Sequence, residues 1–288
     1  MSFIAAPDQS RPSIHNPGQG AKARRMAAVV VLWAALGRAG GVGDIYRDKR
    51  MVLVGPSKQV TQSNFSSYIT EDDLIVRLNL KVVDGSVWIP PKVASFTSPR
   101  THVVCHHSAP HTEKGLFNEA VRKEDAMHDY TLQAYHRHGV KEMVCAEPAR
   151  CDRVIKLRTK GVKVSRLQPD TIRFSKKRQY STGLKCIRDM LCRPILELVI
   201  IGCDWHMGGK VLSYQEGYNE LAAPKGKDMS KITVAEQEGG WHNFTNELRV
   251  FENLLKTEPR LTITQHLKDL LESNLKSDLA NVRILDMV

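Results

Sequence analysis

The chain of 288 residues is long enough for one large domain or two small ones, and its hydrophobic fraction of 42% excludes a disordered or fibrous protein. It carries 42 lysines and arginines against 31 acidic residues, and the net charge of +11 favours polyanionic partners such as nucleic acid, anionic membranes, or sugar nucleotides with acidic acceptors. Charge alone does not choose among these partners.

The first 48 residues are rich in proline, glycine, alanine and arginine, and they predict a flexible arm with one short apolar helix at 26–36. This run is shorter than the roughly 20 residues that a membrane-spanning helix needs, so we expect no transmembrane span. A targeting segment stays open as an alternative, because the arm is basic. The six cysteines are too few for a disulfide scaffold, which favours a soluble, intracellular, cytoplasmic protein.

Residues 49–288 are expected to form a single α/β domain, because short apolar runs alternate there with longer amphipathic segments. A mainly parallel, Rossmann-like sheet with helices on both faces follows from this alternation. The run at 196–201 predicts a buried central strand whose carboxyl end meets a site. Two amphipathic helices are predicted near 248–255 and 267–275. The predicted strands lie at 51–54, 74–78, 102–105, 142–145, 162–164 and 196–202.

The first motif begins where the strand at 51–54 runs into a turn. Gly55 there allows a close backbone approach, and Ser57 offers a hydroxyl and an amide to a phosphate or ribose, although many turns of this kind bind nothing. The next strand places Asp73, Arg77 and Asn79 on one face. A purely structural alternative pairs Asp73 with Arg77 and uses Asn79 as a cap.

The second and third motifs each lie at a predicted helix start. Ser181, Thr182 and Gly183 open the helix at 184–192, where free amides and the positive dipole end bind phosphate, although Ser and Thr are also ordinary N-caps. His242 lies before the helix that follows Glu247, with Asn243 or Thr245 as its N-cap. A positive helix end keeps imidazole neutral and able to accept a proton, whereas an isolated histidine is more often a packing or capping residue.

In this order, the three motifs resemble those of the sialyltransferase family of glycosyltransferases. The family's long motif runs V-V-G-N-S and then I-D-x-x-D-x-V-x-R-x-N, its short motif begins P-S-T-G, and its last motif is H-x-x-x-x-E. The positions that match the long motif are Ile69, Asp73, Ile75, Arg77 and Asn79. The departures are Pro56 in place of the family's Asn, Thr70 in place of its first Asp, and Met51 near a family cysteine.

This resemblance implies a variant GT-A-like fold and an inverting, metal-independent transfer of an acidic sugar. The donor is a cytidine monophosphate (CMP) sugar, which is a substrate, so no cofactor is expected, and the acceptor is the hydroxyl of a glycan or another molecule. The donor contacts fall on Gly55, Ser57, Asn79, Ser181, Thr182 and Gly183. His242 becomes the general base, with Glu247 as its catalytic companion. Secretory relatives join their first two motifs by a disulfide, which is expected to be absent here.

Three alternatives stay open. The basic stretch 153–178 suits a non-catalytic nucleic-acid-binding protein, which is the second choice of function. The turn at 54–57 suits a methyltransferase, but Asn79 stands where such an enzyme has an acid. A metal site can be drawn from Cys105, His106, His107 and His111, although their spacing fits no zinc pattern and a solvated acceptor-side loop explains the histidines between 102 and 138 as well.

Overall fold

The computed structural model of the protein describes residues 45–83, 85–106, 124–146, 161–167, 180–205 and 244–285. The predicted arm lies almost entirely outside these residues, so its boundary stays a prediction. In chain order the elements are β1 (Arg50–Val54), η1 (Lys58–Thr61), η2 (Ser66–Tyr68), β2 (Leu74–Leu78), β3 (Lys81–Val83), β4 (Ser86–Trp88), α2 (Pro91–Phe96), β5 (Val103–His106), α3 (Glu124–Arg137), β6 (Glu142–Cys145), β7 (Lys163–Arg166), α5 (Thr182–Leu191), β8 (Glu197–Ile201), α7 (Phe244–Thr257), β9 (Leu261–Thr264), α8 (Gln265–Leu275) and β10 (Arg283–Leu285).

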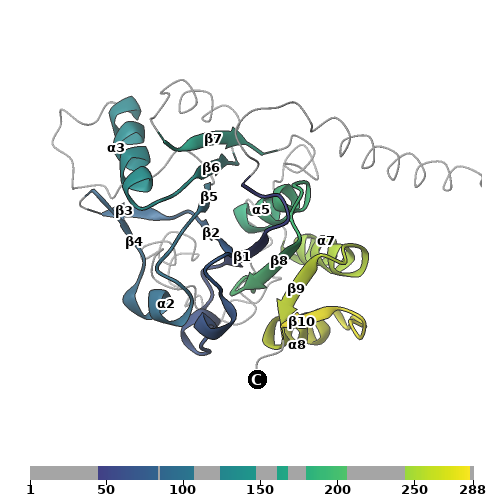
Figure 1. The fold of residues 1–288 in the computed structure, drawn as a ribbon. Helices are drawn as coiled ribbons and strands as arrows, with labels where there is room; N and C mark the ends of the chain where they lie inside the picture. The colour runs from purple at the N-terminus through teal and green to yellow at the C-terminus, as the bar shows by residue number, and fades with distance from the viewer. Residues whose placement is uncertain are drawn as a thin grey trace, which may run out of the picture. The chain divides into compact units, whose positions relative to one another are not determined.

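An eight-stranded sheet has the order β10-β9-β8-β1-β2-β5-β6-β7, while β3 and β4 form a separate antiparallel pair (Figure 1). The neighbouring strands of the large sheet are parallel, as in β1 against β2, where Val52 lies opposite Ile75. The chain moves outward from β1 to β7, and then continues on the other side of β1 from β8 to β10. The strand order therefore reverses between β1 and β8, which is where open α/β sheets commonly bind ligands at their carboxyl edge.

Helices cover both faces of this sheet. On one face, α5, α7 and α8 pack against strand residues such as Leu53 and Ile200. On the other face, α3 packs against Met143, and η1 and α2 pack against Val52 and Val199. Strands covered on both sides are expected to be largely apolar, and β1, β2 and β8 are so apart from Arg50, Arg77 and Glu197. The predicted Rossmann-like α/β fold with a mainly parallel sheet is confirmed.

The polar residues of the first motif make different contacts from those of the structural alternative. Asp73 forms an ion pair with Arg50 at 2.8 Å. Arg77 is fully buried and donates to the carbonyl oxygen of Ser98 at 2.6 Å and to Oγ1 of Thr97 at 3.2 Å. The suggested Asp73–Arg77 pair is therefore wrong. Asp73 joins the start of β2 to Arg50 of β1, and Arg77 joins β2 to the residues that follow α2.

Several elements were not predicted from the sequence. The strand β9 is followed at once by α8, and Thr264 ends the strand and caps the helix by accepting from the amide of Leu267 at 3.3 Å. No turn residue marks that boundary, which hides the strand. The helix α3 occupies 124–137, so the interpretation of this histidine-rich region as a loop is wrong for those residues.

Candidate functional site

Two glycines bring the turn after β1 against the turn after β8. The amide of Gly55 donates to the carbonyl oxygen of Ile201 at 2.7 Å, and the amide of Ser57 donates to that of Gly202 at 2.9 Å. A Cβ atom on Gly55 would lie 2.2 Å from the Gly202 oxygen, and Gly202 itself has a φ of +67°. The close backbone approach predicted at Gly55 is real, but the neighbour is the protein's own strand β8.

Ser57 is 2% exposed, and its polar groups make bonds within the protein. Its hydroxyl donates to the carboxylate of Asp204 at 2.6 Å and accepts from the amide of Gln59 at 3.2 Å, which caps η1. The hydroxyl and the amide that were predicted to hold a donor are thus already bonded. A ligand contact by Ser57 would have to replace one of these bonds, so this contact stays a prediction.

Asn79 directly follows β2 at the carboxyl edge of the sheet. Its φ is +48°, in the left-handed region that asparagine enters more easily than most residues. Its amide donates to the carbonyl oxygen of Cys105 at 2.8 Å, which fixes the backbone against β5. The half-buried Asn79 therefore has a defined position beside the sheet edge, and its contact with a donor stays a prediction.

The second motif begins α5 beside this same edge. Ser181 is the N-cap, because its Oγ accepts from the amide of Leu184, and capping of this kind is worth about 1 kcal/mol. A Cβ atom on Gly183 would lie 3.5 Å from Cδ1 of Leu78, the residue before Asn79. The start of α5 and the end of β2 are therefore in contact, and the first two motifs meet in space.

A disulfide between Cys105 and Cys186 holds α5 to the end of β5, with the two Cα atoms 6.0 Å apart. Cys145 is disulfide-bonded as well. The expected cytoplasmic location therefore loses its support, because disulfides persist mainly outside the reducing cytosol. Spacing along the chain gave no sign of the pairing, because 81 positions separate Cys105 from Cys186.

Glu247 of the third motif joins α7 to the start of α5. Its carboxylate accepts from the amide of Ser181 at 2.8 Å, from the hydroxyl of Ser181 at 2.5 Å, and from the indole nitrogen of Trp205 at 3.3 Å. The Glu247 side chain is fully buried. The second and third motifs, which lie more than 60 positions apart in the chain, thus share one hydrogen-bonded cluster.

Burial raises the pKa of the Glu247 carboxyl to about 7, because removal from water penalises the charged form. The hydrogen bonds from Ser181 and Trp205 and the positive charge of Lys185 act in the opposite direction and lower the pKa. Lys185 is itself fully buried on α5. Glu247 therefore changes charge near neutral pH at the junction of the two motifs.

We expect the Glu247→Gln variant to lose a specific part of the pH dependence of stability. The folded pKa of about 7 lies above the reference value of 4.5, so between these values the folded chain keeps a proton that the unfolded chain has released. The contribution of Glu247 to the free energy of unfolding therefore falls as pH rises through this window, by about 3 kcal/mol, and is level above it. Urea unfolding at about pH 5 and about pH 8 measures this fall.

Glu252→Gln is the matched control for this experiment. Glu252 lies on the same helix, and its pKa is lowered by its hydrogen bond with Lys256, so it titrates below the window. The control variant should show the same fall in stability as the wild type, whereas Glu247→Gln should show a smaller one. Equal falls in all three proteins would contradict a buried Glu247 that takes up a proton.

Trp205 also belongs to this cluster, and its role was not predicted from the sequence. Its φ of +48° is unusual for a bulky side chain and costs on the order of 1–3 kcal/mol, which surrounding contacts must offset. The indole packs against Phe251 of α7 with ring centroids 4.5 Å apart and donates to Glu247. An aromatic residue three positions after the glycine that ends the predicted strand was the available signal.

The structure describes some of the remaining predicted residues and not others. His242 lies outside the described residues. Thr182 is the first residue of α5 and is buried. The helix α7 begins at Phe244, so Thr245 lies inside it and is not its N-cap.

Among the described residues, no group of three histidine, cysteine or acidic side chains is arranged to hold a metal ion. Cys105 is unavailable as a thiolate ligand because it forms the disulfide with Cys186. No helix in the described ranges has the length and apolar character needed to cross a membrane.

No protein-family model matches the chain, and no curated protein matches it. Among solved structures, a mammalian sialyltransferase aligns with a TM-score of 0.44 and 14% sequence identity, covering 83% of this chain and 78% of that chain. A mammalian sialyltransferase in complex with Gal-beta-1-3GalNAc-ortho-nitrophenol aligns with a TM-score of 0.43 and 15% identity, covering 82% and 78%. These scores are too low to carry an assignment of function, which rests below on the residues of this chain.

Proposed function

We propose that the protein is a metal-independent glycosyltransferase of the sialyltransferase type. It transfers an acidic sugar from a CMP-sugar donor to the hydroxyl of a glycan or another acceptor, with inversion at the anomeric carbon. The donor is a substrate, and no cofactor takes part.

The observation that carries this proposal is the meeting of three distant motifs at one edge of the sheet. Gly183 contacts Leu78, the neighbour of Asn79, and Ser181 is hydrogen-bonded to Glu247. Helix starts in a parallel α/β fold all lie at the carboxyl ends of the strands, so the support comes from the direct contacts between these particular residues. A nucleotide-binding enzyme of this fold class places its ligand there.

In this proposal each residue has a defined role. The Asn79 side chain contacts the cytidine part of the donor, and the amides at the start of α5 bind its phosphate with help from the helix dipole. His242 removes the proton from the acceptor hydroxyl while its oxygen attacks the anomeric carbon, and CMP leaves with the electrons of the broken bond. Glu247 positions the start of α7, which follows His242 in the chain, against the start of α5.

Nucleotide selectivity and turnover of the wild-type protein test the proposal. CMP at about 100 times its Kd is expected to raise the melting temperature by about 5 °C or more, whereas UMP and GMP at the same concentration should have smaller effects. CMP–sialic acid should be consumed by hydrolysis or by transfer to lactose, with release of CMP. The proposal would be overturned if the protein showed no preference for CMP over UMP and GMP and did not consume CMP–sialic acid.

A further inference from the structure

The first four backbone amides of α5 need hydrogen-bond acceptors from outside the ladder of the helix. The amide of Leu184 donates to Oγ of Ser181 at 3.4 Å, and the amide of Ser181 donates to the Glu247 carboxylate at 2.8 Å. The amides of Thr182 and Gly183 make no hydrogen bond to another described residue. These two amides are therefore the ones that can receive the donor phosphate of the proposed function.

The Glu247 carboxylate already occupies part of this positive helix start. The groups that face it are Ser181 and Lys185 of α5, and Trp205 of the loop after β8. Lys185 is fully buried, and its positive charge lowers the pKa of Glu247. An ionised Glu247 thus offsets the charge of a buried ammonium, as buried charges require.

A phosphate at the amides of Thr182 and Gly183 would add a second negative charge beside the one on Glu247. Two anions in one buried cluster disfavour each other, so one of them tends to be neutralised by a proton. A phosphodiester is too acidic to take that proton near neutral pH, whereas burial raises the pKa of Glu247 to about 7. The proton therefore goes to Glu247, and the phosphate then balances the charge of Lys185.

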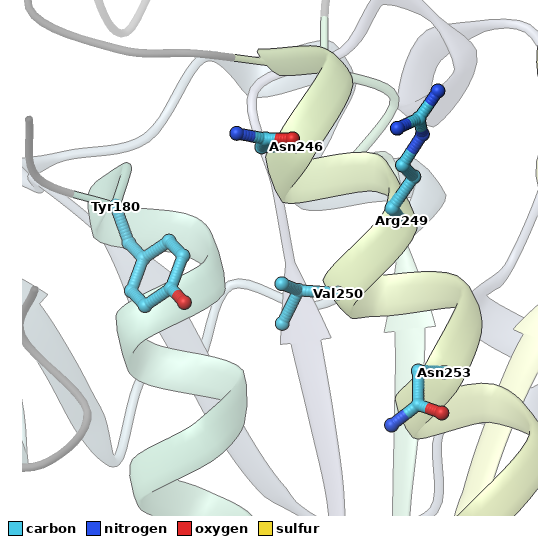
Figure 2. Close-up of a pocket in the computed structure, with 5 residues that line it drawn as sticks. All are labelled: Tyr180, Asn246, Arg249, Val250 and Asn253. Atoms are coloured by element: carbon cyan, nitrogen blue, oxygen red, sulfur yellow. The ribbon is translucent and has the colours of Figure 1, made fainter. Parts of the chain in front are cut away.

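A pocket of about 450 Å³ between α5 and α7 gives this proton a short route from solvent. Tyr180 and Asn246 line the pocket, and they directly precede Ser181 and Glu247 in the chain. Figure 2 shows the two helices side by side, with Tyr180 at the start of α5 and Asn246 near the start of α7. Solvent in the pocket is therefore one residue away from the hydrogen-bonded pair.

We propose that the phosphate of the donor binds at the start of α5 with uptake of one proton by Glu247. This linkage rests on the proposed function, because it uses the donor position assigned there. Below the pKa of about 7, Glu247 is protonated with or without donor, so the affinity is level. Above it, the free protein has lost a proton that the bound form keeps, so the affinity falls as pH rises.

Calorimetric titration of the wild type with the methyl ester of CMP tests this linkage. The phosphodiester of the ester keeps one negative charge throughout, whereas CMP gains a second charge near pH 6. The affinity should be about tenfold weaker at about pH 8.5 than at about pH 6, which corresponds to a rise of about one pKa unit in the bound form. Binding heats in two buffers of different ionisation enthalpy should show uptake of about half a proton at about pH 7.5.

Three variants identify the group that takes up the proton. Glu247→Gln, which is neutral at every pH, should bind the ester with the same affinity at about pH 6 and about pH 8.5. Glu252→Gln on the same helix should keep the tenfold change, because Glu252 titrates at lower pH. His242→Ala should also keep it. This variant and the wild-type proton count test the linkage even where Glu247→Gln does not fold.

Binding of the ester without proton uptake would overturn the linkage. A pH dependence that persists in Glu247→Gln, or that disappears in His242→Ala, would assign the proton to another group and overturn it as well. These outcomes are separate from the proposed function. A protein that consumes CMP–sialic acid but takes up no proton on binding loses only the linkage, and one that takes up the proton through Glu247 without consuming the donor loses only the enzyme.

Discussion

Replacing His242 by alanine is expected to lower the rate of sugar transfer from CMP–sialic acid on the order of 10²–10⁴-fold, the usual contribution of a general base. His242 lies two residues before Phe244, where α7 begins, and the positive end of a helix disfavours the charged imidazolium. A neutral imidazole is the form that accepts the acceptor's proton. The rate constant kcat should therefore carry the loss, and CMP binding, measured by thermal shift, should stay close to the wild type.

His266→Ala is the matched control, because His266 is exposed on α8 and has no place in the proposed mechanism. The wild-type rate should fall at low pH as the base becomes protonated, and His242→Ala should lack this acid limb. Full activity of His242→Ala, or an equal loss in His266→Ala, would contradict the assignment of His242 as the base.

The strands of the central sheet were predictable because burial on both faces demands uninterrupted apolar runs. The six predicted strands correspond to β1, β2, β5, β6, β7 and β8. The strand β9 alternates Leu, Thr, Ile and Thr. It has only four residues and a helix follows it at once, so it gives no uninterrupted apolar run. Hydrophobic patterning therefore identified the centre of the sheet and missed the edge beyond β8.

The site was predictable where the signal is a helix start or a motif spacing. Ser181 was expected as an N-cap, and Glu247 was expected to belong to the same site as Ser181, with which it shares two hydrogen bonds. The partners of Ser57 were not predictable, because Asp204 is 147 positions away and its proximity follows from strand order alone. The contacts of Trp205 were not predictable either, since they depend on how α7 packs on the loop after β8.

Gly55 and Gly183 are both predicted to contact the donor, but their surroundings differ, so alanine is expected to change the stability of the fold differently at the two positions. Gly55→Ala is expected to destabilise the fold by about 4 kcal/mol or more, at the upper end of single substitutions. Its Cβ atom would lie 2.2 Å from the carbonyl oxygen of Gly202 and 2.4 Å from Sγ of Cys203. The nearer atom belongs to the backbone of the turn directly after the central strand β8 and cannot turn aside as a side chain does, so the cost exceeds the about 1–3 kcal/mol of ordinary overpacking.

Gly183→Ala supplies the matched comparison in the first turn of α5. Its Cβ atom would meet only Cδ1 of Leu78 at 3.5 Å, an ordinary contact, and alanine in a helix is favoured over glycine by about 0.5–1 kcal/mol. Urea unfolding should therefore show a large loss for Gly55→Ala and none for Gly183→Ala. With the fold intact, any loss of CMP binding in Gly183→Ala reports a nucleotide that approaches the start of α5 closely. Equal stability of the two variants would contradict the contact between the β1 and β8 turns, and unchanged CMP binding in Gly183→Ala would remove Gly183 from the donor site.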